Sequence, residues 1–127
     1  MLSLSLPGRV FLCTLPTDMR KSFDSLVGLV EQQLGQDPLA GDLFVFRSKR
    51  GDRLKLLYWD SDGLAIWYKR LEEGTFVFPM PDKQRVPVGE HGLLIRPAEL
   101  AMLLDGIDVQ NVKRRQRYQR PQPITSR

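Results

Sequence analysis

The apolar positions of residues 18–34 recur every three to four residues, as on one face of an α-helix. This apolar stripe consists of Met19, Phe23, Leu26, Val27, Val30 and Leu34. Thr17 or Asp18 is placed to cap the helix by accepting a hydrogen bond from a backbone N–H of its first turn. Gly35 and Pro38 favour an end to the helix directly after the stripe.

Shorter apolar runs, separated by turn residues, predict strands. The expected strands are residues 9–15, 43–46, 53–59, 64–70 and 75–78. The turns within residues 43–78 are short and rich in Gly and Asp, so consecutive strands there are expected to be antiparallel neighbours in a meander.

Residues 79–108 contain fewer signals of regular secondary structure. Residues 79–92 are rich in Pro and Gly and predict a loop, and residues 93–95 a strand fragment. Pro97 suits the first turn of a short helix that Gly106 ends. The predicted fold class is α+β: an antiparallel β-meander sheet with helix 18–34 packed on one face, burying Phe23, and a short C-terminal helix.

The charge divides the chain into a body and a tail. Residues 109–127 carry six basic side chains and no acidic one, within a total net charge of +4. The other 108 residues therefore hold 13 basic and 15 acidic side chains and are mildly acidic. We expect a single domain over residues 1–108 and a basic, disordered tail over 109–127. The tail is either an arm for a polyanion or an acidic partner, or only a solvated terminus.

Composition narrows the function classes. No apolar run reaches the roughly 18 residues of a membrane span, and Arg9 interrupts the apolar start, so we expect neither membrane span nor signal peptide and a cytoplasmic protein. The single cysteine, Cys13, is expected to be a core residue, and the single histidine, His91, a loop residue. Phosphate-binding glycine motifs are absent. The sequence predicts no catalytic, cofactor-binding or metal-binding residues, and therefore no enzyme.

One group of side chains suggests a nucleic-acid interface, because cations bind phosphates and aromatic rings stack on bases. The candidate residues are Arg47, Lys49, Arg50, Arg53, Lys55, Lys69 and Arg70 on the predicted hairpins, and Lys113, Arg114, Arg115 and Arg117 in the tail. Trp59 and Trp67 are expected on the same sheet face as Arg53 and Lys55. The alternative is an exposed sheet face that charged side chains keep soluble.

Several sequence blocks, in order, closely resemble the small TnpB-type accessory protein of bacterial insertion sequences of family sixty-six. The blocks are residues 17–24, 35–38, 41–47, 50–55, 58–60, 62–64, 69–72 and 100–108. The resemblance covers about residues 8–108. It implies a role in transposition alongside a separate, larger transposase that carries the cutting and joining chemistry, and it brings no catalytic site.

The sequence thus predicts a non-catalytic accessory protein for transposition that binds DNA, the transposase or both. The alternative is a protein–protein adaptor without nucleic-acid contact, and a small metal-dependent nuclease built from the acidic residues ranks third. The oligomeric state stays open.

Overall fold

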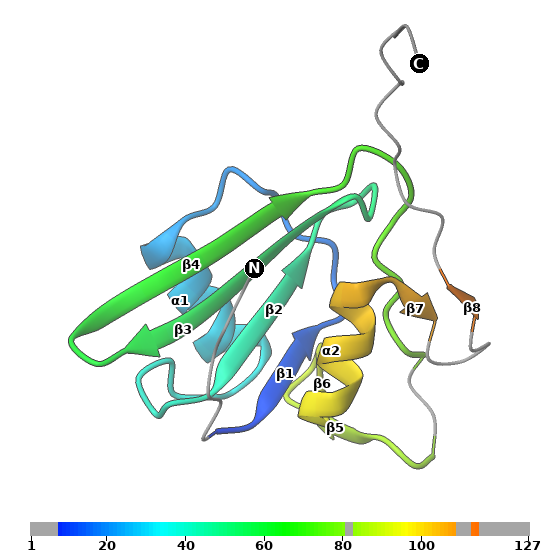
Figure 1. Ribbon diagram of the computed structural model, residues 1–127. Coiled ribbons are helices and arrows are strands. Elements are labelled where there is room, and N and C mark those ends of the chain that lie inside the picture. The colour runs from blue at the N-terminus through cyan, green and yellow to red at the C-terminus, as the bar shows by residue number, and fades with distance from the viewer. Residues whose placement is uncertain (1–7, 81–82, 109–112, 115–127) are drawn as a thin grey trace, which may run out of the picture.

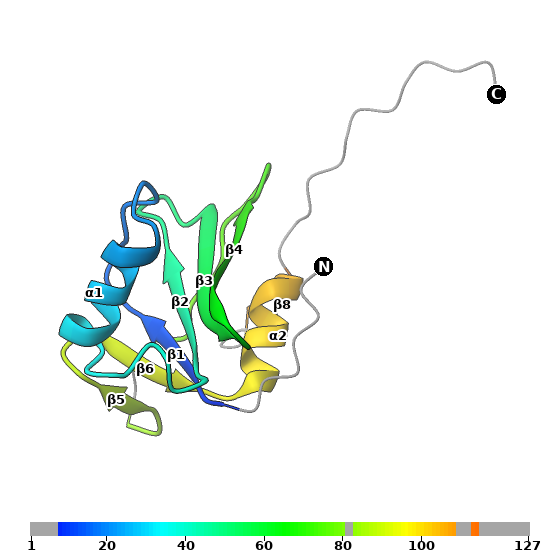
Figure 2. The ribbon, with the colours of Figure 1, turned by 90° about the vertical axis from the view of Figure 1, so that its left-hand side faces the viewer.

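The computed structural model describes residues 8–80, 83–108 and 113–114 of the chain (Figure 1). In chain order the elements are β1 Val10–Cys13, α1 Phe23–Gln33, β2 Leu43–Arg47, β3 Arg53–Asp60, β4 Gly63–Arg70, β5 Val86–Val88, β6 Gly92–Ile95, α2 Pro97–Asp105, β7 Ile107–Asp108 and β8 Lys113–Arg114. The predicted α+β class is confirmed. The structure has a six-stranded sheet with helix α1 on one face and helix α2 on the other (Figure 2).

The sheet has the strand order β4-β3-β2-β1-β6-β5. Strands β2, β3 and β4 are antiparallel neighbours, whereas β1 runs parallel to β2. The sheet is therefore mixed. The sequence had predicted a sheet that is antiparallel throughout, and that prediction is wrong. The reason is the connection: α1 carries the chain from the end of β1 back to the start of β2, and such a crossover joins parallel strands.

Each face of the sheet has its own hydrophobic core. On the α1 face, Leu26 and Val30 pack against Phe11, Phe44 and side chains of neighbouring strands. On the α2 face, a second core includes Leu100 and Leu103 from the helix, and sheet residues such as Val45 and Leu56. Because successive side chains of a strand point to opposite faces, the central strands β1 and β2 are apolar at almost every position.

Helix α1 begins five residues later than expected, at Phe23, with Ser22 as its N-cap. Asp18 does not cap it: its carboxylate accepts a hydrogen bond from the backbone N–H of Arg20 at 2.9 Å and closes a separate turn. Phe23 is thus the first residue of the helix, and its side chain is 43% exposed. The prediction that Phe23 packs in the core is wrong.

Residues 75–78 do not form the expected fourth strand of the meander. Phe76 and Phe78 instead insert into the core on the α2 face. A backbone bond, from the N–H of Phe76 to the carbonyl of Gly51 at 2.7 Å, ties this segment to the turn before β3. The expected loop 79–92 contains a further short strand, β5, which forms one edge of the sheet beside β6.

Helix α2 has a left-handed C-cap at Gly106, where φ is 85°. At its N-terminus the carboxylate of Glu99 accepts a hydrogen bond from the backbone N–H of Arg96 at 3.1 Å. The same buried carboxylate lies 2.6 Å from the guanidinium of Arg85. Burial alone would raise the pKa of Glu99, but these hydrogen bonds outweigh it and the pKa is lowered.

Most of the predicted basic tail lies outside the described residues. Within it, the structure describes only Lys113–Arg114, which pair antiparallel with Ile107–Asp108 as β8 and β7. No helix in the described part of the chain is long and apolar enough to cross a membrane.

Candidate nucleic-acid interface

The structure divides the basic residues predicted on the hairpins into internal and exposed ones. Arg47 is half-buried, and burial lowers the pKa of its guanidinium. Its Nη1 donates a hydrogen bond to the carbonyl of Phe76 at 2.9 Å, and the guanidinium lies 4.1 Å from the centre of the Phe78 ring. Arg47 thus holds residues 76–78 against the sheet and is not free to bind a phosphate.

Lys55 is also an internal residue, since it is only 8% exposed. Its ammonium donates hydrogen bonds to the carbonyls of Met19 at 2.8 Å and Lys21 at 2.7 Å. It lies 4.7 Å from the centre of the Tyr68 ring as well. This side chain therefore fastens the segment before α1 to β3, and its assignment to a nucleic-acid interface stays a prediction.

The remaining basic residues gather at one end of the sheet, where β3 begins and β4 ends. Lys49 and Arg50 are exposed in the turn between β2 and β3. Arg53 lies opposite Arg70 across the β3–β4 pair, next to Lys69. These five cations lie at the same end of the sheet, although Lys69 is on the α2 face and Arg53 and Arg70 are on the other face.

Two of these five cations have partners of their own. Nη1 of Arg53 donates a hydrogen bond to the hydroxyl of Tyr68 at 3.2 Å, and this contact raises the pKa of Arg53. The guanidinium of Arg70 forms an exposed ion pair with Glu72 at 2.9 Å. Within the part of the chain that the structure describes, Lys49, Arg50 and Lys69 form no ion pair.

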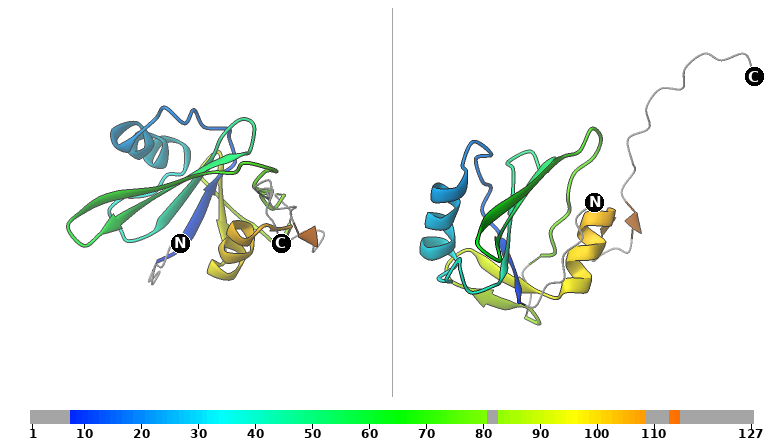
Figure 3. Two further views of the ribbon diagram at one scale, coloured as in Figure 1. Left: turned by 45° about the horizontal axis from the view of Figure 1, so that its top comes forward. Right: turned by 60° about the vertical axis from the view of Figure 1, so that its left-hand side comes forward.

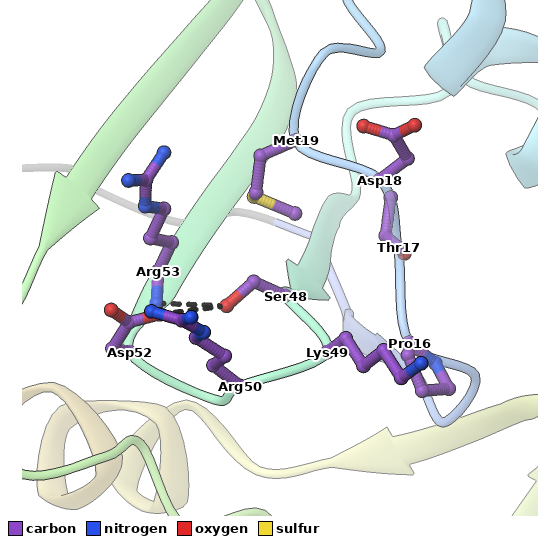
Figure 4. Close-up of a pocket in the computed structure, with 9 residues that line it drawn as sticks. All are labelled: Pro16, Thr17, Asp18, Met19, Ser48, Lys49, Arg50, Asp52 and Arg53. Carbon is purple, nitrogen blue, oxygen red and sulfur yellow. Dashed lines mark hydrogen bonds between the residues drawn. The ribbon is translucent and has the colours of Figure 1, made fainter.

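A cavity of about 500 Å³ opens beside the turn between β2 and β3 (Figure 4). Its lining residues are Pro16, Thr17, Asp18, Met19, Ser48, Lys49, Arg50, Asp52 and Arg53. Side-chain hydrogen bonds span the turn: the hydroxyl of Ser48 accepts one from the backbone N–H of Arg53 at 3.1 Å and donates one to a carboxylate oxygen of Asp52 at 3.3 Å. Gly51 supplies the positive φ of 81° that this turn requires.

The cavity carries both signs of charge. Asp18 faces it from the segment before α1, and hydrogen bonds from Arg20 lower the pKa of Asp18 to about 2. Asp18 therefore stays ionised at neutral pH, and Asp52 lines the same cavity as Lys49 and Arg50. The sequence did not place Thr17 and Asp18 at this site, because only the fold brings them beside the turn.

The two tryptophans do not share a face, so that prediction is wrong for Trp67. Trp67 lies directly opposite Leu56 across the β3–β4 pair and packs against the core on the α2 face. Trp59 is 37% exposed at the other end of β3 from Arg53. Six residues of strand separate them, about 20 Å. The exposed cations and the exposed tryptophan do not form one cluster.

The other residues considered for catalysis or metal binding have structural roles. Cys13 is buried, and burial raises the pKa of its thiol. His91 lies in the turn before β6, where its carbonyl accepts a hydrogen bond from the backbone N–H of Thr14 at 2.8 Å. Among the residues with described placement, no group of three or more His, Cys, Asp or Glu side chains is arranged to hold a metal ion. Asp60 to Gly63 form the β3–β4 hairpin turn.

The site is therefore a surface turn with exposed charges on a small mixed sheet. Comparison with known proteins gives the family: residues 8–114 match the family described as IS66 Orf2 like protein, and the chain belongs to it. The family implies an accessory role associated with transposition.

Two relatives from Sinorhizobium fredii (strain NBRC 101917 / NGR234) are both described as uncharacterized proteins. The chain is 42% identical to y4jC over 107 residues, which is 84% of this chain and 86% of the relative. It is 40% identical to y4hO over 100 residues, which is 79% of this chain and 81% of the relative. No solved structure matches the chain.

Proposed function

We propose that this protein is a non-catalytic accessory factor of insertion-sequence transposition, acting in the cytoplasm, and that it contacts DNA through the exposed cations Lys49, Arg50 and Lys69. Family membership supports the role in transposition. The observation that carries the DNA contact is that these three cations lie at one end of the sheet without ion pairs in the described part of the chain.

The geometry suits the DNA backbone better than base edges. The cations project from a short turn and a strand end, and no helix or β-ribbon that would enter a groove carries them. Contacts of this kind position a protein on a duplex without reading its sequence. The neighbouring carboxylates of Asp52 and Glu72 weaken the local positive potential, so we expect a modest affinity for DNA. We expect the transposase to select the DNA sequence.

The DNA contact is tested by the salt dependence of binding to a short duplex. Replacing both Lys49 and Arg50 with Ala is expected to flatten the slope of log affinity against log salt by up to about two, since each phosphate contact contributes about 0.9. Fluorescence anisotropy of a labelled duplex measures this slope for the full chain.

The matched control is the double variant Lys83→Ala/Arg96→Ala, which removes the same charge near the β5–β6 edge, away from the turn. This control should leave the slope nearly unchanged. Truncation after Arg114 removes four further basic side chains and measures the contribution of residues 115–127 separately. If Lys49→Ala/Arg50→Ala and the control alter the slope equally, the turn is not a DNA-binding site.

A protein–protein adaptor is the second candidate. The mixed charges around the cavity favour it, because alternating signs suit a complementary protein surface better than a uniformly negative duplex. If the protein binds the transposase, and if its own affinity for duplex DNA is the same with and without the transposase, the adaptor function is favoured over the first.

A further inference from the structure

Strand β4 forms one outer edge of the sheet, and no described strand pairs with its free side (Figure 3). The opposite edge, β5, has only three residues and includes Pro87, which lacks a backbone N–H. Short length and proline are common ways to protect an edge strand from pairing. β4 has eight residues and no proline, and residues 64–67 are apolar. This edge is open to a further strand.

The pairing with β3 shows which backbone groups of β4 are free. The N–H of Leu71 donates to the carbonyl of Asp52 at 2.7 Å, directly after the last residue of β4. Residues that bond to the neighbouring strand alternate along an antiparallel pair. The odd-numbered residues of β4 therefore bond to β3, and the N–H and C=O groups of Leu64, Ile66, Tyr68 and Arg70 point away from the sheet.

The charges along this edge favour one kind of partner. The turn that precedes β4 carries Asp60 and Asp62, whereas the last two residues of β4 are Lys69 and Arg70, of which Arg70 also forms the exposed ion pair with Glu72. A second copy lying antiparallel brings the acidic end of each β4 beside the basic end of the other. A parallel copy would bring like charges together, which is unfavourable.

We propose that β4 pairs with the β4 of a second copy of this chain, antiparallel and centred on Ile66. In this register Leu64 lies opposite Tyr68 of the second copy, and Asp62 lies beside its Arg70. The small Ala65 lies opposite the large Trp67 on the other face. Sliding the second strand by two residues in either direction keeps the outward backbone groups aligned. These registers place Asp62 opposite Glu72 or Tyr68 of the second copy, so the ion pair between Asp62 and Arg70 is lost.

The pairing also covers apolar surface that is open in the single chain. Tyr68 is 47% exposed, and Leu64 and Ile66 are only partly buried beneath α1. A two-fold axis through Ile66, perpendicular to the sheet, places both α1 helices on the same face of a continuous twelve-stranded sheet, twice the six strands of one chain. The contact is isologous, so each charge pair occurs twice.

Sedimentation velocity of the DNA-free full chain tests the proposal through a charge exchange. The protein is expected to dimerise reversibly. Asp62→Arg and Arg70→Asp alone should each weaken dimerisation by about tenfold, because each places like charges together at both ends of the interface. The double variant Asp62→Arg/Arg70→Asp restores opposite charges and should return the dissociation constant to within about threefold of the original.

Glu90→Lys is the matched control, since it reverses one exposed charge near the opposite edge of the sheet. It should leave dimerisation unchanged. A second measurement does not depend on any variant: amide hydrogen exchange of Leu64, Ile66 and Tyr68 should slow as protein concentration rises. A chain that is monomeric at every concentration, a double variant that does not recover, or concentration-dependent protection elsewhere and not on β4 would overturn the proposal.

Discussion

Phe44→Ala is expected to lower the free energy of unfolding by about 3–5 kcal/mol, whereas Phe23→Ala should lower it by less than about 1 kcal/mol. Phe44 is fully buried and stacks on Phe11, with ring centres 5.7 Å apart and planes 14° from parallel. Its removal leaves a cavity in the core on the α1 face. Phe23 lies partly in solvent at the first turn of α1, so its removal leaves little empty space.

Urea denaturation followed by circular dichroism gives both free energies under the same conditions. The two substitutions are chemically identical, so the difference between them reports only where each ring lies. Equal losses would contradict the placement of α1, and would return Phe23 to the core position that its spacing in the sequence suggested.

Lys55→Met is expected to lower the free energy of unfolding by about 2–4 kcal/mol. Methionine keeps the length and apolar packing of the side chain but cannot donate to the carbonyls of Met19 and Lys21. These carbonyls then lose a charged donor in a part-buried position, which costs more than the loss of an exposed contact.

Lys69→Met on the neighbouring strand is the control for Lys55→Met. Lys69 is exposed and has no ion pair in the described residues, so its replacement should change the free energy by no more than about 0.5 kcal/mol. The same denaturation experiment compares the two. If both lysines prove equally tolerant, the ammonium of Lys55 does not hold the segment before α1.

The sequence predicted the elements better than their pairing. Local signals predicted the strands near residues 10–13, 43–47, 53–60 and 63–70. Apolar runs and the turn residues that bound them lie next to each other in the sequence. The neighbours of β1 were not predicted. Val10 pairs with Leu43 on one side and Ile95 on the other, and pairings this distant in the chain leave no local pattern.

At the candidate site, too, local features could be predicted from the sequence and contacts between distant segments could not. Charge and turn chemistry indicated Lys49 and Arg50 as exposed cations, and they are exposed. The burial of Lys55 depends on a segment more than thirty residues earlier in the chain, which no local pattern relates to β3. A signal for Trp67 was available, since a turn centred on residues 61–62 pairs it with Leu56 and so sets its face.

The central position of β1 has a consequence for the order in which the chain is made. β1 leaves the ribosome well before one of its two neighbours, β6, which ends at Ile95. Until β6 has been synthesised, that side of β1 has no partner, and its apolar side chains lack part of the core. Non-local pairings of this kind form late and slowly. The domain therefore completes its folding only after β6 has left the ribosome, and a nascent chain stalled before residue 92 exposes an unpaired, aggregation-prone strand.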